Sequence, residues 1–245
     1  FIRNNHFLFL IRKEAMEYLG IVESKTLENQ GINYLVDLGI THVQLMPTYS
    51  FGGVNNNIKD AFNKDFKYNW GYNPVLYNAP SNWYASCDNA YNSINEFKMM
   101  IDEFHKNDIK VCLDMVYNHT GEGGLVNHNV DDANLFSYAL IDNSSYYKVY
   151  KNGYYRSNSG CGNDFNISND GALNLIVDSL EFWVNQGVDA FRFDLAAALL
   201  EHNVECEEIY DHINSLAARL KEKLEEKNIS VVDDFSKAQK GIVLI

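Results

Sequence analysis

Apolar residues along the chain follow two alternating patterns, one typical of amphipathic helices and one typical of buried strands. The helical pattern occurs four times, in residues 30–38, 93–104, 176–184 and 209–224. A short and mostly apolar stretch follows each of them, in residues 40–46, 109–115, 187–194 and 241–245. Because helices that alternate with apolar strands are typical of βαβ units, this pattern predicts an α/β fold with a parallel sheet.

Local signals mark the ends of these predicted helices. Gly39 and Gly187 follow the first and third helical stretches, in positions where glycine commonly ends a helix. Ser93 and Glu96 stand three residues apart at the start of the second stretch. This spacing fits a capping box and predicts that the helix begins at that point.

The third predicted strand carries two charged residues on one face. Side chains alternate between the two faces of a strand, so Arg192 and Asp194 point to the same side and can touch. The guanidinium would then hold the carboxylate ionised, as a carboxylate nucleophile requires. A structural ion pair at the end of a strand is the alternative interpretation.

Polar residues gather where two neighbouring predicted strands end. One strand ends near Asp114, Asn118 and His119, and the next ends with Arg192 and Asp194. A doubly wound sheet and a (β/α)8 barrel both place ligand sites at the carboxyl ends of their strands, so both remain open on this pattern. No glycine-rich phosphate loop follows any strand, which weakens the dinucleotide-binding form of the doubly wound sheet.

Two connections are much longer than ordinary loops between strands and helices. Residues 118–170 and 51–91 are rich in Asn, Asp, Gly, Ser and Tyr, and neither stretch has low complexity. Long ordered connections of this kind are usually functional. We expect residues 118–170 to form a long loop or a small inserted subdomain that lines the site.

Composition narrows the class of ligand. The chain has 245 residues and a formal net charge of −13, without the basic clusters that neutralise a phosphate backbone. We therefore expect no nucleic-acid partner, and the charge suits a neutral ligand such as a sugar. The 16 tyrosines, 14 phenylalanines and 3 tryptophans supply rings for the core and, in loops, for stacking on sugars.

The cysteines bear on the cellular compartment. Cys87, Cys112, Cys161 and Cys206 show neither a C-x-x-C pair nor a zinc-like spacing, and they fit a reduced, cytoplasmic environment. No apolar run reaches the length of a membrane helix, so we expect no membrane partner. No signal peptide is visible, and because the chain opens on Phe1 we expect its true N-terminus to be missing. The sequence makes no prediction of oligomeric state.

Three segments resemble one enzyme family, in the order expected along the chain. Residues 114–120, Asp-Met-Val-Tyr-Asn-His-Thr, resemble the first signature region of the α-amylase superfamily, glycoside hydrolase family 13. Residues 191–196, Phe-Arg-Phe-Asp-Leu-Ala, resemble its second signature region. Residues 68–74, Tyr-Asn-Trp-Gly-Tyr-Asn-Pro, are similar to a segment typical of pullulanase-type debranching enzymes, which often carry Asp where Asn73 stands.

Finer resemblances point to debranching enzymes within this superfamily. Residues 31–47 look like pullulanases, whereas residues 159–164 and 194–197 look more like isoamylases and glycogen-debranching enzymes. The resemblance implies a hydrolase that cleaves α-1,6-glucosidic branch linkages in glycogen, starch or pullulan, with an α-glucan as its partner. Residues 197–202 lack the lysine-histidine pair common in plain α-amylases, which counts against an α-1,4 endo-amylase.

Competing functions remain open beside this one. An α-1,4-acting amylase or glucanotransferase of the same superfamily is the nearest alternative. A non-catalytic glycan-binding relic is the second, and a metal-dependent barrel hydrolase is the weakest because His119 lacks the histidine partners of a zinc site.

The same resemblance implies a (β/α)8 TIM barrel. Residues 1–245 would form one incomplete catalytic barrel that holds about strands two to five. Residues 118–170 would then be the insertion that follows the third strand.

The resemblance also implies catalytic roles in a retaining double displacement. Asp194 matches the nucleophile, and Arg192 matches the residue that holds this carboxylate ionised. His119 matches a residue that hydrogen-bonds the sugar in the cleaved subsite as charge develops at the anomeric carbon. A structural histidine is the alternative for His119.

Four further residues are candidates for substrate binding by the same comparison. Tyr72 would stack under the sugar ring, with a core tyrosine as its alternative. Asp114 would be a buried carboxylate that supports the loop carrying His119. Trp70 fits packing better than ligand contact. Asn118 matches a calcium-binding position of many α-amylases, so calcium is considered there, although the reaction requires no cofactor.

The general acid of this family is a glutamate just after the fifth barrel strand. Residues 241–245 look like that strand, so we expect the glutamate just beyond Ile245. We therefore expect the 245-residue chain to be inactive by itself, because it would lack the group that protonates the leaving oxygen.

Overall fold

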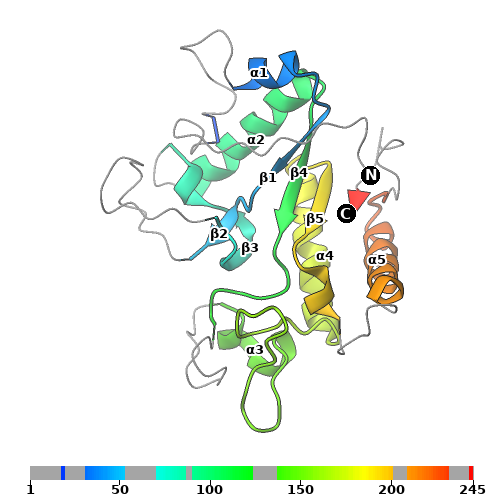
Figure 1. Ribbon diagram of the computed structural model, residues 1–245. Helices are drawn as coiled ribbons and strands as arrows, with labels where there is room; N and C mark the ends of the chain where they lie inside the picture. Colours follow the sequence, from blue (N-terminus) through cyan, green and yellow to red (C-terminus); the bar gives the residue numbers. More distant parts are fainter. Residues whose placement is uncertain are drawn as a thin grey trace.

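Four parallel strands form the central sheet of the protein (Figure 1). The structure is a computed structural model that describes residues 18–19, 31–52, 70–86, 90–123, 137–200, 209–231 and 243–244. The strands are, in order across the sheet, β1 (His42–Leu45), β4 (Lys110–Met115), β5 (Ala190–Phe193) and β6 (Val243–Leu244). Every adjacent pair runs parallel, which confirms the parallel sheet predicted from the apolar pattern.

Helices connect these strands, as predicted. In chain order α1 (Ile32–Asp37), α2 (Ala90–Lys106), α4 (Asp170–Asn185) and α5 (Ile209–Glu226) precede β1, β4, β5 and β6. Each helix turns apolar side chains into the core: Leu35, Phe97, Ile101, Phe104, Ile176, Leu180, Trp183, Leu216, Leu220 and Leu224 are all buried. None of these helices, over the ranges just given, is long and apolar enough to cross a membrane.

The backbone conformation just after α4 requires a glycine. Gly187 has φ of 98°, a left-handed value that side chains other than glycine rarely adopt. A β-carbon at this position would lie 2.9 Å from Cγ2 of Ile101 on α2. The predicted stop signal is therefore confirmed, and it has a second cause that spacing alone does not reveal, the close approach of α2.

The predicted start of α2 is wrong. The helix begins at Ala90, so Ser93 lies inside the helix rather than before it. The Glu96 carboxylate accepts hydrogen bonds from the backbone N–H of Ser86, at 2.9 Å, and from the Ser86 hydroxyl. The spacing of a serine and a glutamate cannot distinguish a capping box from a glutamate that bonds to a neighbouring segment, and here the neighbouring segment is the partner.

Two further strands lie beside the sheet. β2 (Tyr49–Phe51) and β3 (Pro74–Pro80) form an antiparallel pair, and the short 3-10 helix η2 (Asn82–Tyr84) follows β3. The indole Nε1 of Trp183 donates to the carbonyl of Tyr77 at 2.8 Å, and both side chains are fully buried. This bond anchors β3, and with it the chain just before β3, against the helix that leads into β5.

The long connection between β4 and α4 lies at the carboxyl ends of the strands. Figure 1 shows the arrows of β4 and β5 pointing toward the part of this connection that carries α3 (Ala139–Tyr146). After α3 the chain forms two isolated bridges, Tyr147 with Phe165 and Val149 with Tyr155. The boundaries predicted for this insertion, 118–170, remain a prediction.

Candidate active site

The candidate site is centred on one guanidinium nitrogen between two carboxylates. The register of β4 and β5 sets Asp114 beside Arg192, and Asp194 follows the last residue of β5. Nη1 of Arg192 donates to Asp114 Oδ1 at 2.8 Å, to Asp114 Oδ2 at 3.0 Å and to Asp194 Oδ1 at 2.7 Å. The predicted contact between Arg192 and Asp194 is confirmed, and Asp114 joins it from the neighbouring strand.

Burial separates the two carboxylates. The side chain of Asp114 is 1% exposed, whereas that of Asp194 is 24% exposed. Burial raises the pKa of Asp114, and the hydrogen bonds from Arg192 and Tyr72 oppose that rise. Burial alone would lower the pKa of Arg192, but the two carboxylates raise it above its ordinary value, so the guanidinium is a fixed cation. Asp194 is the carboxylate of the pair that a ligand can reach.

Asn118 links Asp194 to His119. Its Nδ2 donates to the backbone carbonyl of Asp194 at 2.7 Å and to Asp194 Oδ2 at 3.2 Å. Its Oδ1 lies 2.5 Å from Nδ1 of His119. The amide therefore orients the backbone and the carboxylate of Asp194 together with the imidazole.

These contacts bear on the calcium interpretation of Asn118. The amide oxygen that would ligate the ion faces His119 instead. Among the residues that the structure describes, no group of three or more His, Cys, Asp or Glu could hold a metal ion. Calcium needs six to eight oxygen ligands, and a calcium site at Asn118 stays a prediction.

His119 is a buried and neutral imidazole. Burial lowers its pKa, against smaller opposing effects of a hydrogen bond to Tyr72 and of the charges on Asp194 and Asp164. Its Nε2 lies 3.1 Å from the carbonyl of Tyr72, and its own carbonyl accepts from the Tyr77 hydroxyl at 2.8 Å. Both oxygens that face the ring are acceptors, so a neutral ring can satisfy only one of them at a time.

The two aromatic candidates lie in different surroundings. Tyr72 is half-buried, and its hydroxyl donates to Asp114 Oδ2 at 2.7 Å. Burial and the bond to Asp114 raise the pKa of Tyr72, so it remains a neutral donor. Trp70 is 61% exposed and so lies outside the buried core, and its packing role stays a prediction. A role in ligand contact stays a prediction for both residues.

Sequence reasoning expected residues 118–170 to line the site but gave no individual role to a residue of the loop 156–164. Asp164 is fully buried, and its Oδ1 accepts from the backbone N–H of Ser159 at 2.9 Å and from the Ser159 hydroxyl at 2.7 Å. Burial chiefly raises the pKa of Cys161, and the charges of Asp164 and Asp194 raise it further. Nδ2 of Asn163 in this loop donates to Oγ1 of Thr120, the residue after His119, at 2.9 Å. The resemblance of residues 159–164 to isoamylases was the sequence signal that could have pointed to this loop.

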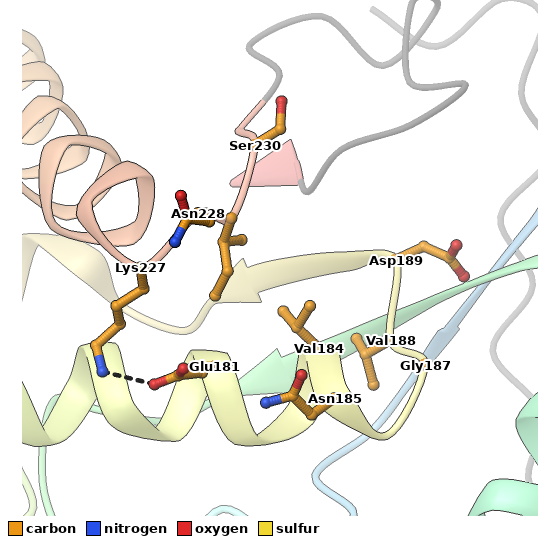
Figure 2. Close-up of a pocket in the computed structure, with 10 residues that line it drawn as sticks. Glu181, Val184, Asn185, Gly187, Val188, Asp189, Lys227, Asn228 and Ser230 are labelled. Carbon is orange, nitrogen blue, oxygen red and sulfur yellow. Dashed lines mark hydrogen bonds and ion pairs between the residues drawn. The ribbon is translucent and has the colours of Figure 1, made fainter.

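A cavity lies at the other end of the strands. It has a volume of about 560 Å³ and is lined by residues at the end of α4, by residues 187–189 and by residues 227–230 after α5. Figure 2 shows these side chains, with Lys227 paired to Glu181. Asp189 precedes β5 whereas Asp194 follows it, so the cavity is at the amino ends of the strands and apart from the candidate site.

Comparisons with known sequences show which family this chain resembles. The family model for the catalytic domain of α-amylase matches residues 29–231. The isoamylase of Pseudomonas amyloderamosa is 41% identical over 170 residues, which cover 68% of this chain and 22% of that protein. The glycogen operon protein GlgX homolog of Mycobacterium bovis is 38% identical over 171 residues, 69% of this chain and 22% of that protein.

Solved structures give the same result. The pullulanase from Bacillus acidopullulyticus matches with a TM-score of 0.67 and 30% identity, covering 91% of this chain and 26% of that one. The chain spans about a fifth of the length of the curated relatives it matches. Its fold, the strand-end carboxylates and the match over residues 29–231 together show that the chain belongs to the family of α-amylase catalytic domains.

Proposed function

We propose that the chain is part of the catalytic barrel of a debranching enzyme, one that hydrolyses α-1,6-glucosidic linkages in glycogen, starch or pullulan. The observation that carries the proposal is the guanidinium of Arg192 between a buried carboxylate and an accessible one, at the carboxyl ends of adjacent parallel strands. A (β/α)8 barrel places its active site at this end of its strands. In the proposal β1, β4, β5 and β6 are strands two to five of the barrel, and residues 118–170 are the insertion after the third.

Asp194 is the nucleophile in this proposal. Its carboxylate attacks the anomeric carbon and forms a glycosyl ester while the leaving oxygen takes a proton; water then cleaves the ester with retention of configuration. The bond from Arg192 aims the Asp194 carboxylate, and Asp114 holds Arg192 from the other side. Asn118 orients the second oxygen of the same carboxylate. Several groups thus hold the nucleophile before substrate arrives, so little reorganisation is needed in the reaction.

His119 and Tyr72 contact the sugar in this proposal. A sugar hydroxyl that displaces the Tyr72 carbonyl from Nε2 of His119 would give the neutral imidazole a partner for its second nitrogen. The ring of Tyr72 would stack under the sugar, with its hydroxyl fixed by Asp114.

The general acid remains a prediction outside the described residues. We propose none of the described residues for that role. Proton transfer by such a group contributes on the order of 10² to 10⁴ in rate.

The relatives support the substrate class by their names. Isoamylases, a glycogen operon protein and pullulanases are among the matches. Pullulanases from Anoxybacillus sp. LM18-11 were solved with maltotriose and with maltotetraose bound, and these chains are 28% and 26% identical to this one.

The cytoplasmic location also stays a prediction; it is supported by Cys112 and Cys161, both of which are free.

Product analysis of the full-length protein on pullulan tests the proposal. We expect maltotriose units from the wild type, because pullulan carries an α-1,6 bond after every third glucose, and no product from Asp194→Asn. An α-1,4-acting amylase or glucanotransferase would leave the α-1,6 bonds in its products. A glycan-binding relic would bind pullulan without turnover, and either result would overturn the proposal.

A further inference from the structure

The insertion between β4 and α4 is bonded to both strand ends that carry the proposed catalytic residues. We propose that Lys148, within this insertion, is a positioning residue for Asp194. The proposal rests on the function inferred above, and it concerns a side chain that donates to backbone carbonyls rather than one that takes part in the chemical step. Lys148 acts through the short segment that directly follows the nucleophile.

The contact is made by the ammonium group of Lys148. Its Nζ donates to the carbonyl of Leu199 at 2.9 Å and to the carbonyl of Leu200 at 3.0 Å. These carbonyls lie at the end of η4 (Ala196–Leu199), a 3-10 helix that begins two residues after Asp194. Carbonyls at a helix end have no partner within the helix, and a cation there also interacts favourably with the helix dipole. Lys148 therefore holds the far end of η4 in place.

The turn between Asp194 and η4 depends on support from both sides. Leu195 is the residue between them, and it has φ of 45°, a left-handed value that is unfavourable for a leucine. Its side chain is 47% exposed, so burial of the leucine does little to hold this conformation. Backbone hydrogen bonds hold this conformation instead. The N–H of Asp194 donates to the carbonyl of Met115 at 2.9 Å, and the N–H of Ala198 donates to the carbonyl of Leu195 at 2.9 Å. If loss of the Lys148 side chain releases η4, the bond from Ala198 to Leu195 weakens.

Lys148 projects from a well-fixed backbone. Its N–H donates to the carbonyl of Asp164 at 2.9 Å, and its carbonyl accepts from the N–H of Arg156 at 2.7 Å. The preceding residue, Tyr147, is fully buried. The Lys148 ammonium therefore reaches η4 from a backbone segment that hydrogen bonds hold in place, rather than from a free loop.

The same insertion holds the strand end that carries His119. Glu122 is a fully buried carboxylate that accepts from the backbone N–H groups of Ser137, at 2.6 Å, and Ala139, at 3.1 Å, and from the hydroxyl of Tyr147. The hydroxyls of Tyr147 and Thr120 also form a hydrogen bond of 2.7 Å. Neighbouring residues of the insertion, Tyr147 and Lys148, thus reach the two catalytic strand ends. This arrangement can set the distance between His119 and Asp194.

Kinetics of the full-length enzyme on pullulan give the first test. We expect Lys148→Met to lower kcat on the order of 10-fold to 100-fold with KM changed less than about threefold, because a displaced nucleophile impairs chemistry more than binding. Lys148→Arg can still donate to two carbonyls and should recover most of kcat. Lys151→Met, on the exposed hairpin three residues along, is the matched control and should behave as wild type.

Amide hydrogen exchange tests the inference without relying on activity. In Lys148→Met we expect faster exchange at Ala198 and Leu200, whose N–H groups bond within η4, and unchanged exchange in β4 and α4. Unchanged kcat together with unchanged exchange at these amides would overturn the positioning role, as would an arginine variant that is as impaired as the methionine variant. A wild type without glucan hydrolysis would refute the proposed function alone, because the exchange result would still decide the role of Lys148.

Discussion

At the residue scale, the candidate site is organised by charge and burial. One nitrogen of Arg192 serves both Asp114 and Asp194, and only Asp194 is open to a ligand. The alternation of side chains along a strand was enough to predict that Arg192 and Asp194 meet. The bond from Asn118 to Asp194 joins residues 76 positions apart, and no local pattern reports such a contact.

The buried imidazole of His119 makes stability depend on pH. Its pKa in the folded protein lies below the ordinary value of 6.5, so the unfolded chain binds more protons between these two values. The contribution of the neutral ring is then fully present above about pH 6.5 and is lost as the pH falls toward the folded pKa. We expect the wild type to lose stability relative to His119→Gln as the pH falls below 6.5.

Denaturant unfolding of the two proteins at a series of pH values measures this difference. The other histidines are present in both proteins, so their contributions cancel in the comparison. Parallel curves for wild type and variant from pH 7.5 to pH 5 would contradict a depressed pKa at His119.

At the element scale, apolar periodicity predicted which segments are helices and strands, and tertiary contacts decided some of their ends. All four predicted pairs of helix and strand are present in the described residues. The start of α2 was wrong because Glu96 bonds to Ser86 on the preceding segment instead of capping its own helix. Lys148 and Glu122 were also missed, since their partners lie in distant parts of the chain.

The end of α4 supplies a prediction about helix packing. Gly187→Ala should lower the free energy of unfolding for two reasons, the left-handed backbone and the close approach of Ile101. The backbone alone costs about 1–2 kcal/mol for a non-glycine residue. We expect a larger total loss, measured by denaturant unfolding.

Gly153→Ala is the matched control for this substitution. Gly153 has φ of 81°, and a β-carbon there would meet nothing within 4 Å, so this variant carries the backbone cost without the contact. Equal losses in the two variants would show that the contact between Gly187 and α2 has no energetic weight.

At the scale of the whole molecule, the sheet sets the site and the insertion completes it. β4 and β5 bring Asp114, Arg192 and Asp194 together, and the segment after β4 adds Asn118 and His119. The alternation of helices and strands predicted this parallel sheet but left a doubly wound sheet and a barrel open. Resemblance to a family, rather than periodicity, favoured the barrel. The fold of the insertion was beyond prediction, because its contacts depend on aromatic and polar side chains without a regular period.

The most direct test of the account is to trap the covalent intermediate on the full-length enzyme. A fluorinated maltosyl fluoride forms the glycosyl ester quickly and releases it slowly, so the labelled residue can be found by peptide mass spectrometry. We predict a glycosyl adduct on Asp194 and none in the Asp194→Asn variant. An adduct on another carboxylate, or hydrolysis with inversion of configuration, would contradict the assignment of Asp194 as the nucleophile.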